Sequence, residues 1–368
     1  MIHRRGSSQL GYVRLFKLVL VVWLAAAVLV PRSSAQSPQA AASLKFSLFD
    51  RYLESLRQQA GIPGLSAVIV QERRIVWERV AGSANVEESI PVLPITTFVV
   101  GDLTQTFAAV LLMQCVERGT LGLNESMRRW TPLIPDASAT VRQVLLHISE
   151  PPNLFKYNPS RYATLAQVIE GCGQQPYRKL LAEEILDPLG MIDSVPGQDL
   201  GNPLSPARTL FEEEKLQQYS SALRRVAVPY KLDKRGRPTR TEYTPTGINA
   251  AIGLVTTARD LSRFDAALDD FQLLLPETVA FTRTNAVAGT VTLPVGYGWF
   301  VQQFEGRQVV WRFAAVPDAY SSLIVKIPER EVTLILLANS EGLSAPFALE
   351  QGDVTTSLFA RLFLRLFI

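Results

Sequence analysis

Histidine and cysteine are scarce in this chain. Its 368 residues include two histidines and two cysteines, and His3 lies in the basic N-terminal segment, so His147 is the single histidine of the rest. One histidine cannot supply a histidine-rich zinc site, and no carboxylate or thiol cluster with metal-ligand spacing surrounds it. The sequence therefore predicts no metal centre and no cofactor.

An excess of basic charge is also missing once the N-terminus is set aside. Residues 1–35 carry five basic residues and no acid, so the remaining 333 residues have a net charge of −2, against +3 for the whole chain. Paired arginines at 73–74, 128–129 and 224–225 are typical of solvated surface, and no basic stripe with interleaved aromatics accompanies them. We predict no nucleic-acid partner.

The apolar run Leu18–Val30 is too short for a comfortable membrane span, which needs about 20 residues. Basic residues precede it, and Ser33-Ser34-Ala35 follows with small side chains, as in a secretory signal peptide. We predict a signal peptide at 1–35, cleavage near Ala35, and an exported periplasmic or extracellular protein with no further membrane contact. A retained anchor is the alternative.

The two cysteines leave two interpretations open. Cys115 lies on an apolar helical pattern, and Cys172 lies between two glycines at the end of another. A disulfide is compatible with export, but the sequence cannot pair them. We favour two buried free thiols.

The order of the predicted elements indicates an α+β fold. The pattern predicts a helix at 44–60, two strands at 65–71 and 75–81, and a mostly helical block at 102–270. Two hairpins follow, 297–304 with 307–313 and 320–327 with 332–338, and a last helix at 351–368. This order is not the alternation of a parallel sheet. We expect an antiparallel sheet flanked by N- and C-terminal helices, with an all-helical lobe inserted after its second or third strand. Residues 36–368 then form one domain, with an α/β lobe at about 44–101 and 271–368 and a helical lobe at about 102–270.

The stretch from Thr97 to Gly119 organises this prediction. An apolar run ends at Gly101, a helix opens at Asp102, and apolar residues then recur near a 3.6-residue spacing. Asp102 and Gln105 lie three apart on the first turn, where aspartate is a favoured N-cap and glutamine completes a capping box. The residues alone therefore predict a cap that contributes about 1 kcal/mol to stability.

The same stretch resembles the Gly-Ser-x-x-Lys-x-Phe motif of the serine β-lactamase and penicillin-binding-protein-like superfamily, most closely its class C and esterase branch. Gly101, Phe107 and the V-E-R-G ending at 116–119 are present, whereas Asp102 takes the place of the nucleophilic serine and Gln105 that of the lysine. Similar strings follow in order at 177–191, 250–264 and 316–340. The resemblance covers nearly all of the chain after the signal and implies the same fold, with its site at the seam between lobes.

The family's other two motifs are also altered. In F-K-Y-N-P-S-R-Y, Tyr157 keeps the tyrosine of Tyr-x-Asn, but Pro159 stands where the asparagine belongs. The third motif, a His or Lys followed by Thr or Ser and Gly, is nearest in register to Phe313, Ala314 and Ala315. The resemblance also gives His147 a structural role at a helix end.

These substitutions imply an inactive homologue. The family's acyl transfer needs a serine, a lysine one turn on, a tyrosine and an oxyanion hole. No Ser-x-x-Lys or Gly-x-Ser-x-Gly occurs elsewhere, and Thr104 lies about 200° round the helix from Asp102. We therefore expect a pseudoenzyme that binds a peptide, a cell-wall fragment or an acyl chain in the interlobe cleft without cleaving it.

Two other functions stay open. Asp102 can be considered as a carboxylate nucleophile in a divergent esterase or other hydrolase. The chain can also serve as a structural partner of another exported protein. The segment 199–246, with a charged helix and a basic loop, fits either a lid over the cleft or a solvated loop.

Overall fold

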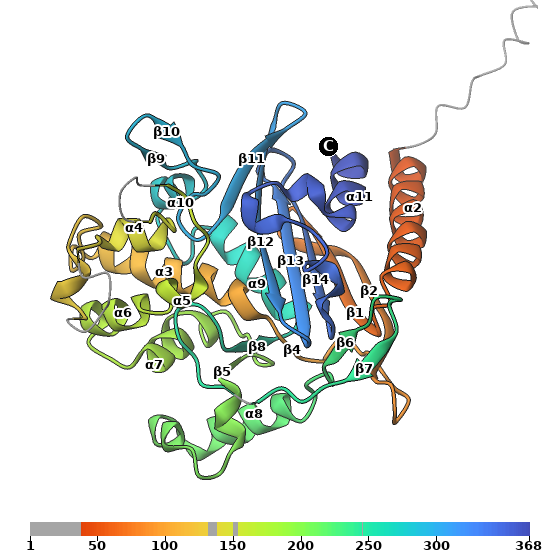
Figure 1. Ribbon diagram of the computed structural model, residues 1–368, viewed down its shortest axis with the longest axis horizontal. Coiled ribbons are helices and arrows are strands. Elements are labelled where there is room, and N and C mark those ends of the chain that lie inside the picture. Colours follow the sequence, from red (N-terminus) through yellow and green to blue (C-terminus); the bar gives the residue numbers. More distant parts are fainter. Residues whose placement is uncertain (1–37, 132–137, 150–153, 245) are drawn as a thin grey trace, which may run out of the picture. The chain divides into compact units, whose positions relative to one another are not determined.

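The computed structural model describes residues 38–131, 138–149, 154–244 and 246–368 (Figure 1). The chain forms two compact units, 1–47 and 48–368. The described part of the first unit is the start of helix α2 (Pro38–Gln59), and the second unit holds every other described element. The predicted signal peptide at 1–35 lies outside the described residues. Within the described part, no helix combines the length and the apolarity needed to cross a membrane.

A seven-stranded antiparallel sheet forms the centre of the second unit (Figure 1). In spatial order its strands are β11 (Phe300–Phe304), β12 (Arg307–Val316), β13 (Tyr320–Ile327), β14 (Val332–Ala338), β1 (Gly64–Gln71), β2 (Arg74–Asn85) and β3 (Ile90–Pro91). The predicted α+β fold is confirmed, and β13 and β14 have the predicted bounds. The β11–β12 hairpin turns at Glu305 and Gly306, both with positive φ, as a two-residue hairpin requires.

Helices cover both faces of this sheet. Phe49 of α2 packs edge-on against Trp77 of β2, the cross-strand partner of Ile69. On the other side, Lys326 of β13 contacts Asp265 of α9 (Ala258–Asp269). The cross-strand partner of Lys326 is Thr333 of β14, and Thr333 is in turn the partner of Val70 of β1. Because neighbouring strand residues point to opposite faces, α2 and α9 lie on opposite sides of β1. Residues 65–70 are accordingly buried throughout.

The predicted helical block contains more strand than expected. Its helices are α3 (Thr104–Glu117), α4 (Val141–Leu145), α5 (Pro159–Tyr162), α6 (Leu165–Gly173), α7 (Tyr177–Leu181), α8 (Glu213–Leu223) and α9, and α10 (Pro276–Thr282) follows the block. The short strands β4 (Phe98–Val99), β8 (Leu254–Thr256) and β5 (Val195–Pro196) form a small sheet, and β6 (Tyr230–Leu232) with β7 (Pro238–Arg240) and β9 (Val287–Ala288) with β10 (Val291–Thr292) form two-stranded hairpins. The charged segment at 212–215 does open a helix, α8, as predicted.

The last helix starts later than predicted. Helix α11 spans Leu358–Phe367, whereas the prediction began at Gln351. Gly352 has a φ of 90°, and Ser357 caps α11 by accepting a hydrogen bond from the Ala360 N–H. Gly352 interrupts a helix and Ser357 begins one, but the apolar spacing continues through both positions. The predicted start was therefore too early.

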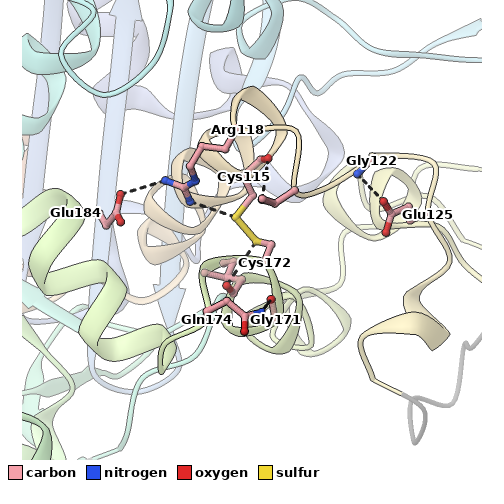
Figure 2. The surroundings of a disulfide bond; sticks show 10 residues. Cys115, Arg118, Gly122, Glu125, Gly171, Cys172, Gln174 and Glu184 are labelled. Carbon is pink, nitrogen blue, oxygen red and sulfur yellow. Dashed lines mark hydrogen bonds and ion pairs between the residues drawn. A yellow bond between two sulfur atoms is a disulfide. The ribbon is translucent and has the colours of Figure 1, made fainter.

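The prediction of two free thiols is wrong. Cys115 of α3 and Cys172 of α6 form a disulfide (Figure 2). Both sulfur-bearing residues are buried, and the Arg118 guanidinium lies 3.4 Å from the Cys115 Sγ. Each cysteine was assigned to a helix correctly, but helical periodicity does not say that α3 packs against α6.

We predict that replacing both cysteines with alanine lowers the free energy of unfolding by about 4 kcal/mol. The bond joins residues 57 apart, and cross-linking a loop of that length removes a corresponding entropy from the unfolded chain. Urea unfolding of the oxidised protein and of Cys115→Ala/Cys172→Ala measures the difference. A reductant should lower the stability of the wild type and leave the variant unchanged; equal stability of the two oxidised proteins would contradict the prediction.

Candidate functional site

The turn that precedes α3 lies against the C-terminal end of β12. A 3-10 turn, η1 (Gly101–Leu103), precedes α3, and Gly101 has a φ of 51°. A Cβ atom added there would lie 2.7 Å from Val316 and 3.0 Å from Ala314. Glycine is therefore required both by the backbone conformation and by the close approach of the strand.

The predicted capping box is wrong. Neither η1 nor α3 has a side-chain cap, and Thr104 occupies the first α-helical position instead of an interior one. The side chains of Asp102 and Gln105 form hydrogen bonds with residues distant in sequence. Tertiary partners have displaced the local capping arrangement that the sequence favours.

Asp102 accepts a hydrogen bond from Tyr157. The Tyr157 hydroxyl lies 2.7 Å from Asp102 Oδ2, and both residues are half-buried. Burial raises the pKa of the Asp102 carboxyl, partly offset by the Tyr157 hydrogen bond and by the positive charge of Arg312. The same burial raises the pKa of the Tyr157 hydroxyl well above its ordinary value. The Tyr157 hydroxyl therefore stays protonated and donates a hydrogen bond to the Asp102 carboxyl.

Gln105 is fully buried and connects three partners. Its Nε2 donates to the Tyr157 hydroxyl at 3.3 Å, and its Oε1 accepts from Arg312 and lies 3.1 Å from His147 Nε2. Both the nitrogen and the oxygen of the Gln105 amide are thus hydrogen-bonded.

The sequence reasoning missed Arg312. This β12 residue is 1% exposed, and its Nη2 donates to Gln105 Oε1 and, at 3.2 Å, to the Tyr157 hydroxyl. Its guanidinium lies 5.4 Å from the centre of the Tyr157 ring. Among the described carboxylates none forms an ion pair with Arg312. The Tyr157 hydroxyl lies between Arg312 and Asp102, because it accepts a hydrogen bond from the first and donates one to the second. The available signal was one charged residue in the otherwise apolar run V-V-W-R-F-A-A-V.

His147 is a satisfied helix-end histidine, as predicted. It follows α4 with a φ of 53°, and its Nδ1 accepts a hydrogen bond from the Asn158 N–H at 3.1 Å. Nε2 must then carry the proton and donate it to Gln105. Burial, reinforced by Arg312 and Arg161, holds the pKa of the imidazole well below its ordinary value.

The remaining motif positions contribute apolar surface. Pro159 is the first residue of α5, and the side chain of Asn158 caps that helix by accepting from the Arg161 N–H at 3.0 Å. The asparagine next to the expected position is therefore turned toward the helix. The Phe313 ring lies 5.5 Å from the Tyr157 ring, Ala314 is buried beside Gly101, and Ala315 is half-buried in β12.

The structure thus brings Asp102, Gln105, Tyr157 and Phe313 together and adds His147 and Arg312 to them. Pro159 and Ala315 stay outside this hydrogen-bonded group. In the part of the chain that the structure describes, no three His, Cys, Asp or Glu residues are placed to hold a metal ion.

The sequence profile of the Beta-lactamase family matches residues 49–353. Penicillin-binding protein 4* of Bacillus subtilis (strain 168) is 23% identical over 73% of this chain and 66% of its own length, and putative penicillin-binding protein PbpX of the same organism is 24% identical over 59% and 57%. This chain therefore spans less than two thirds of these curated relatives.

Solved structures share the fold. The octameric penicillin-binding protein homologue from Pyrococcus abyssi superposes with a TM-score of 0.69 at 22% identity, covering 87% of this chain and 77% of the other. The D-amino acid amidase from Ochrobactrum anthropi SV3 gives 0.65 at 21% identity, covering 87% and 99%. At these identities the likeness shows the fold alone.

We predict that Asp102→Asn stabilises the protein at pH 7. Asparagine keeps an oxygen acceptor for the Tyr157 hydroxyl and removes a charge that burial disfavours. Because the folded-state pKa of Asp102 is raised, the protonated carboxyl contributes to the free energy of unfolding below the unfolded-state pKa. This contribution is lost as pH rises through the folded-state pKa. The advantage of the variant should shrink as pH falls toward about 4.

Thermal and urea unfolding between pH 4 and 8 measure this effect. Asp102→Ala is the matched control, because it removes the acceptor as well as the charge and should be about 1–2 kcal/mol less stable than the asparagine variant. Lower stability of Asp102→Asn than of the wild type at pH 7 would mean that attraction to Arg312 outweighs the cost of burial.

We also predict that His147 of the folded protein stays neutral as the pH falls from 8 through the ordinary histidine pKa of about 6.5. Its folded pKa is depressed, so the unfolded chain takes up the proton first and stability falls as pH drops below about 6.5. Heteronuclear NMR of the imidazole should show a neutral ring protonated on Nε2 across this range. The same signal in denaturant serves as the control; a folded-state titration near 6.5 would contradict the assignment.

Proposed function

Because the chain belongs to the Beta-lactamase family, we propose that it is an exported member that binds a ligand beside Asp102 and carries out no acyl transfer. The observation that carries this proposal is the hydrogen-bonded group at the start of α3. By their resemblance to the motif, Asp102 and Gln105 stand where the family has its serine and lysine, and both side chains are bonded to Tyr157.

The site offers no evident nucleophile for the family reaction. That reaction needs a hydroxyl next to a group that can take its proton. Asp102 has no hydroxyl, and its carboxylate accepts the Tyr157 hydrogen bond. The neighbouring Thr104 donates to the Gly101 carbonyl at 2.7 Å and accepts from the Leu254 N–H at 3.2 Å, so its hydroxyl is committed to the backbone.

The residues around Asp102 also lack an available base. A glutamine amide does not accept a proton near neutral pH, and an arginine guanidinium has no lone pair available to act as a base. The His147 imidazole is neutral, but one nitrogen accepts from Asn158 and the other donates to Gln105. These commitments support the loss of general-base catalysis.

What remains is suited to binding. The half-buried Asp102 carboxylate can accept a hydrogen bond from an amide N–H, and the half-buried Tyr157 ring, backed by the buried Phe313 ring, provides an apolar contact. The relatives are named for penicillin binding and for D-amino acid amides. We propose a peptide or a cell-wall fragment with a free amide N–H as the ligand. An acyl chain bound at the same site is the apolar alternative.

Export has two supports. The Cys115–Cys172 disulfide is stable in an oxidising compartment, where such bonds are common. The basic segment, apolar run and small residues at 1–35 have the order of a secretory signal. We propose a periplasmic or extracellular location after cleavage near Ala35.

We predict saturable binding without turnover. The purified protein is titrated calorimetrically with a D-alanyl-D-alanine peptide, a muropeptide and a short acyl amide. In parallel it is assayed against short-chain aryl esters and a chromogenic cephalosporin. Asp102→Ala should weaken amide binding about tenfold or more, because a charge-assisted hydrogen bond is lost. Leu204→Ala, at a position 87% exposed, should leave binding unchanged.

The same experiment distinguishes the two other functions. Turnover by the wild type that disappears in Asp102→Ala would overturn the proposal and make Asp102 the nucleophile of a divergent hydrolase. Neither binding nor turnover by folded protein would instead favour a structural role with another exported protein.

A further inference from the structure

Helix α11 is apolar on two sides. Its inward residues Phe359, Phe363 and Phe367 are buried, and the last two pack against Phe49 of α2. A second stripe, Leu358, Leu362 and Leu366, recurs every four residues and faces outward, with Leu358 43% exposed. Packing on the sheet explains the first stripe only.

The outward stripe lines a groove of about 450 Å³ between α2 and α11. Tyr52, which is 55% exposed, and Leu56 form its α2 wall. The remaining lining residues are the three leucines, Arg361 and Arg365. No described acidic side chain lines it, so the groove combines apolar surface with positive charge alone.

The two arginines line the groove, and Arg361 is also attracted electrostatically to the Asp353 carboxylate. Arg361 and Arg365 lie one helical turn apart, Arg365 is exposed, and neither forms an ion pair within the described chain. Their aliphatic stems can lie along the leucines while their guanidinium groups reach outward.

We propose that this groove docks on an anionic lipid bilayer surface, a contact that goes beyond ligand binding at Asp102. Leucines at the level of the upper acyl chains, a tyrosine at the interface and arginines on lipid phosphates are the elements of a helix lying in the membrane plane. Arg361 and Arg365 exclude α11 as a spanning helix but favour an interfacial one. The sequence had predicted no membrane contact beyond the signal.

Charge favours the anionic bilayer over two other occupants of the groove, a second copy of the chain and the N-terminal segment 1–35. A second copy of the chain, meeting the first across a two-fold axis, would bring two arginines against two arginines. The apolar run Leu18–Val30 belongs to a segment, residues 1–35, that has five basic residues and no acid. Only the anionic surface supplies charge of the opposite sign.

The test uses the full chain with a polarity-sensitive dye on Leu362→Cys, since both native cysteines are held in the disulfide. Phosphatidylglycerol vesicles should shift the emission to the blue, and phosphatidylcholine vesicles should not. Adding Arg361→Gln and Arg365→Gln should raise the lipid concentration at half-effect about thirtyfold, because each near-surface arginine contributes about fivefold.

The matched control carries the dye on Leu204→Cys, at an exposed position outside the groove. It should stay in water even if the N-terminal run inserts into the vesicles. A Leu362 dye that does not respond to anionic vesicles overturns the proposal. A blue shift without lipid that grows with protein concentration also overturns it, because a second copy then occupies the groove. A blue shift without lipid that disappears when residues 1–35 are removed overturns it as well, because that N-terminal segment then occupies the groove.

Discussion

The buried guanidinium of Arg312 is the constraint on which the site depends. A cation that is 1% exposed destabilises the fold by several kcal/mol unless hydrogen-bond acceptors surround it. Its Nη2 donates to Gln105 Oε1 and to the Tyr157 hydroxyl, its Nε has no partner among the described residues, and its charge offsets only part of the cost of burying the Asp102 carboxyl. A lysine at position 105 would place a second cation at this spot. The substitutions at 102 and 105 and the arginine at 312 therefore form one compatible set.

The fold holds this set at the junction of a helix and a strand. Gly101 lets the start of α3 approach β12 closely, which is why residues of both elements reach Tyr157. Farther along α3, Cys115 fixes the helix to α6 through the disulfide. The first turn is thus held by backbone contact and its own hydrogen bonds, with no need for a side-chain cap.

Sequence patterns could predict the sheet but not the partners within the site. Alternation and turn residues placed β13 and β14 correctly, because both signals are local. The cap at Asp102 was predicted wrongly, since local propensity cannot foresee a hydrogen bond from Tyr157, 55 residues away. The Cys115–Cys172 bond and the role of Arg312 escaped for the same reason. Each depends on packing between elements that no periodicity describes.

The central claim is that no acyl group is transferred to this protein. Intact-mass measurement after incubation with a penicillin, a cephalosporin and an activated ester tests it most directly, because a covalent intermediate is seen even when turnover is slow. The account predicts an unchanged mass with all three. A gain equal to one acyl group, mapped by peptide digestion to Asp102 or to any other residue of the site, would contradict it.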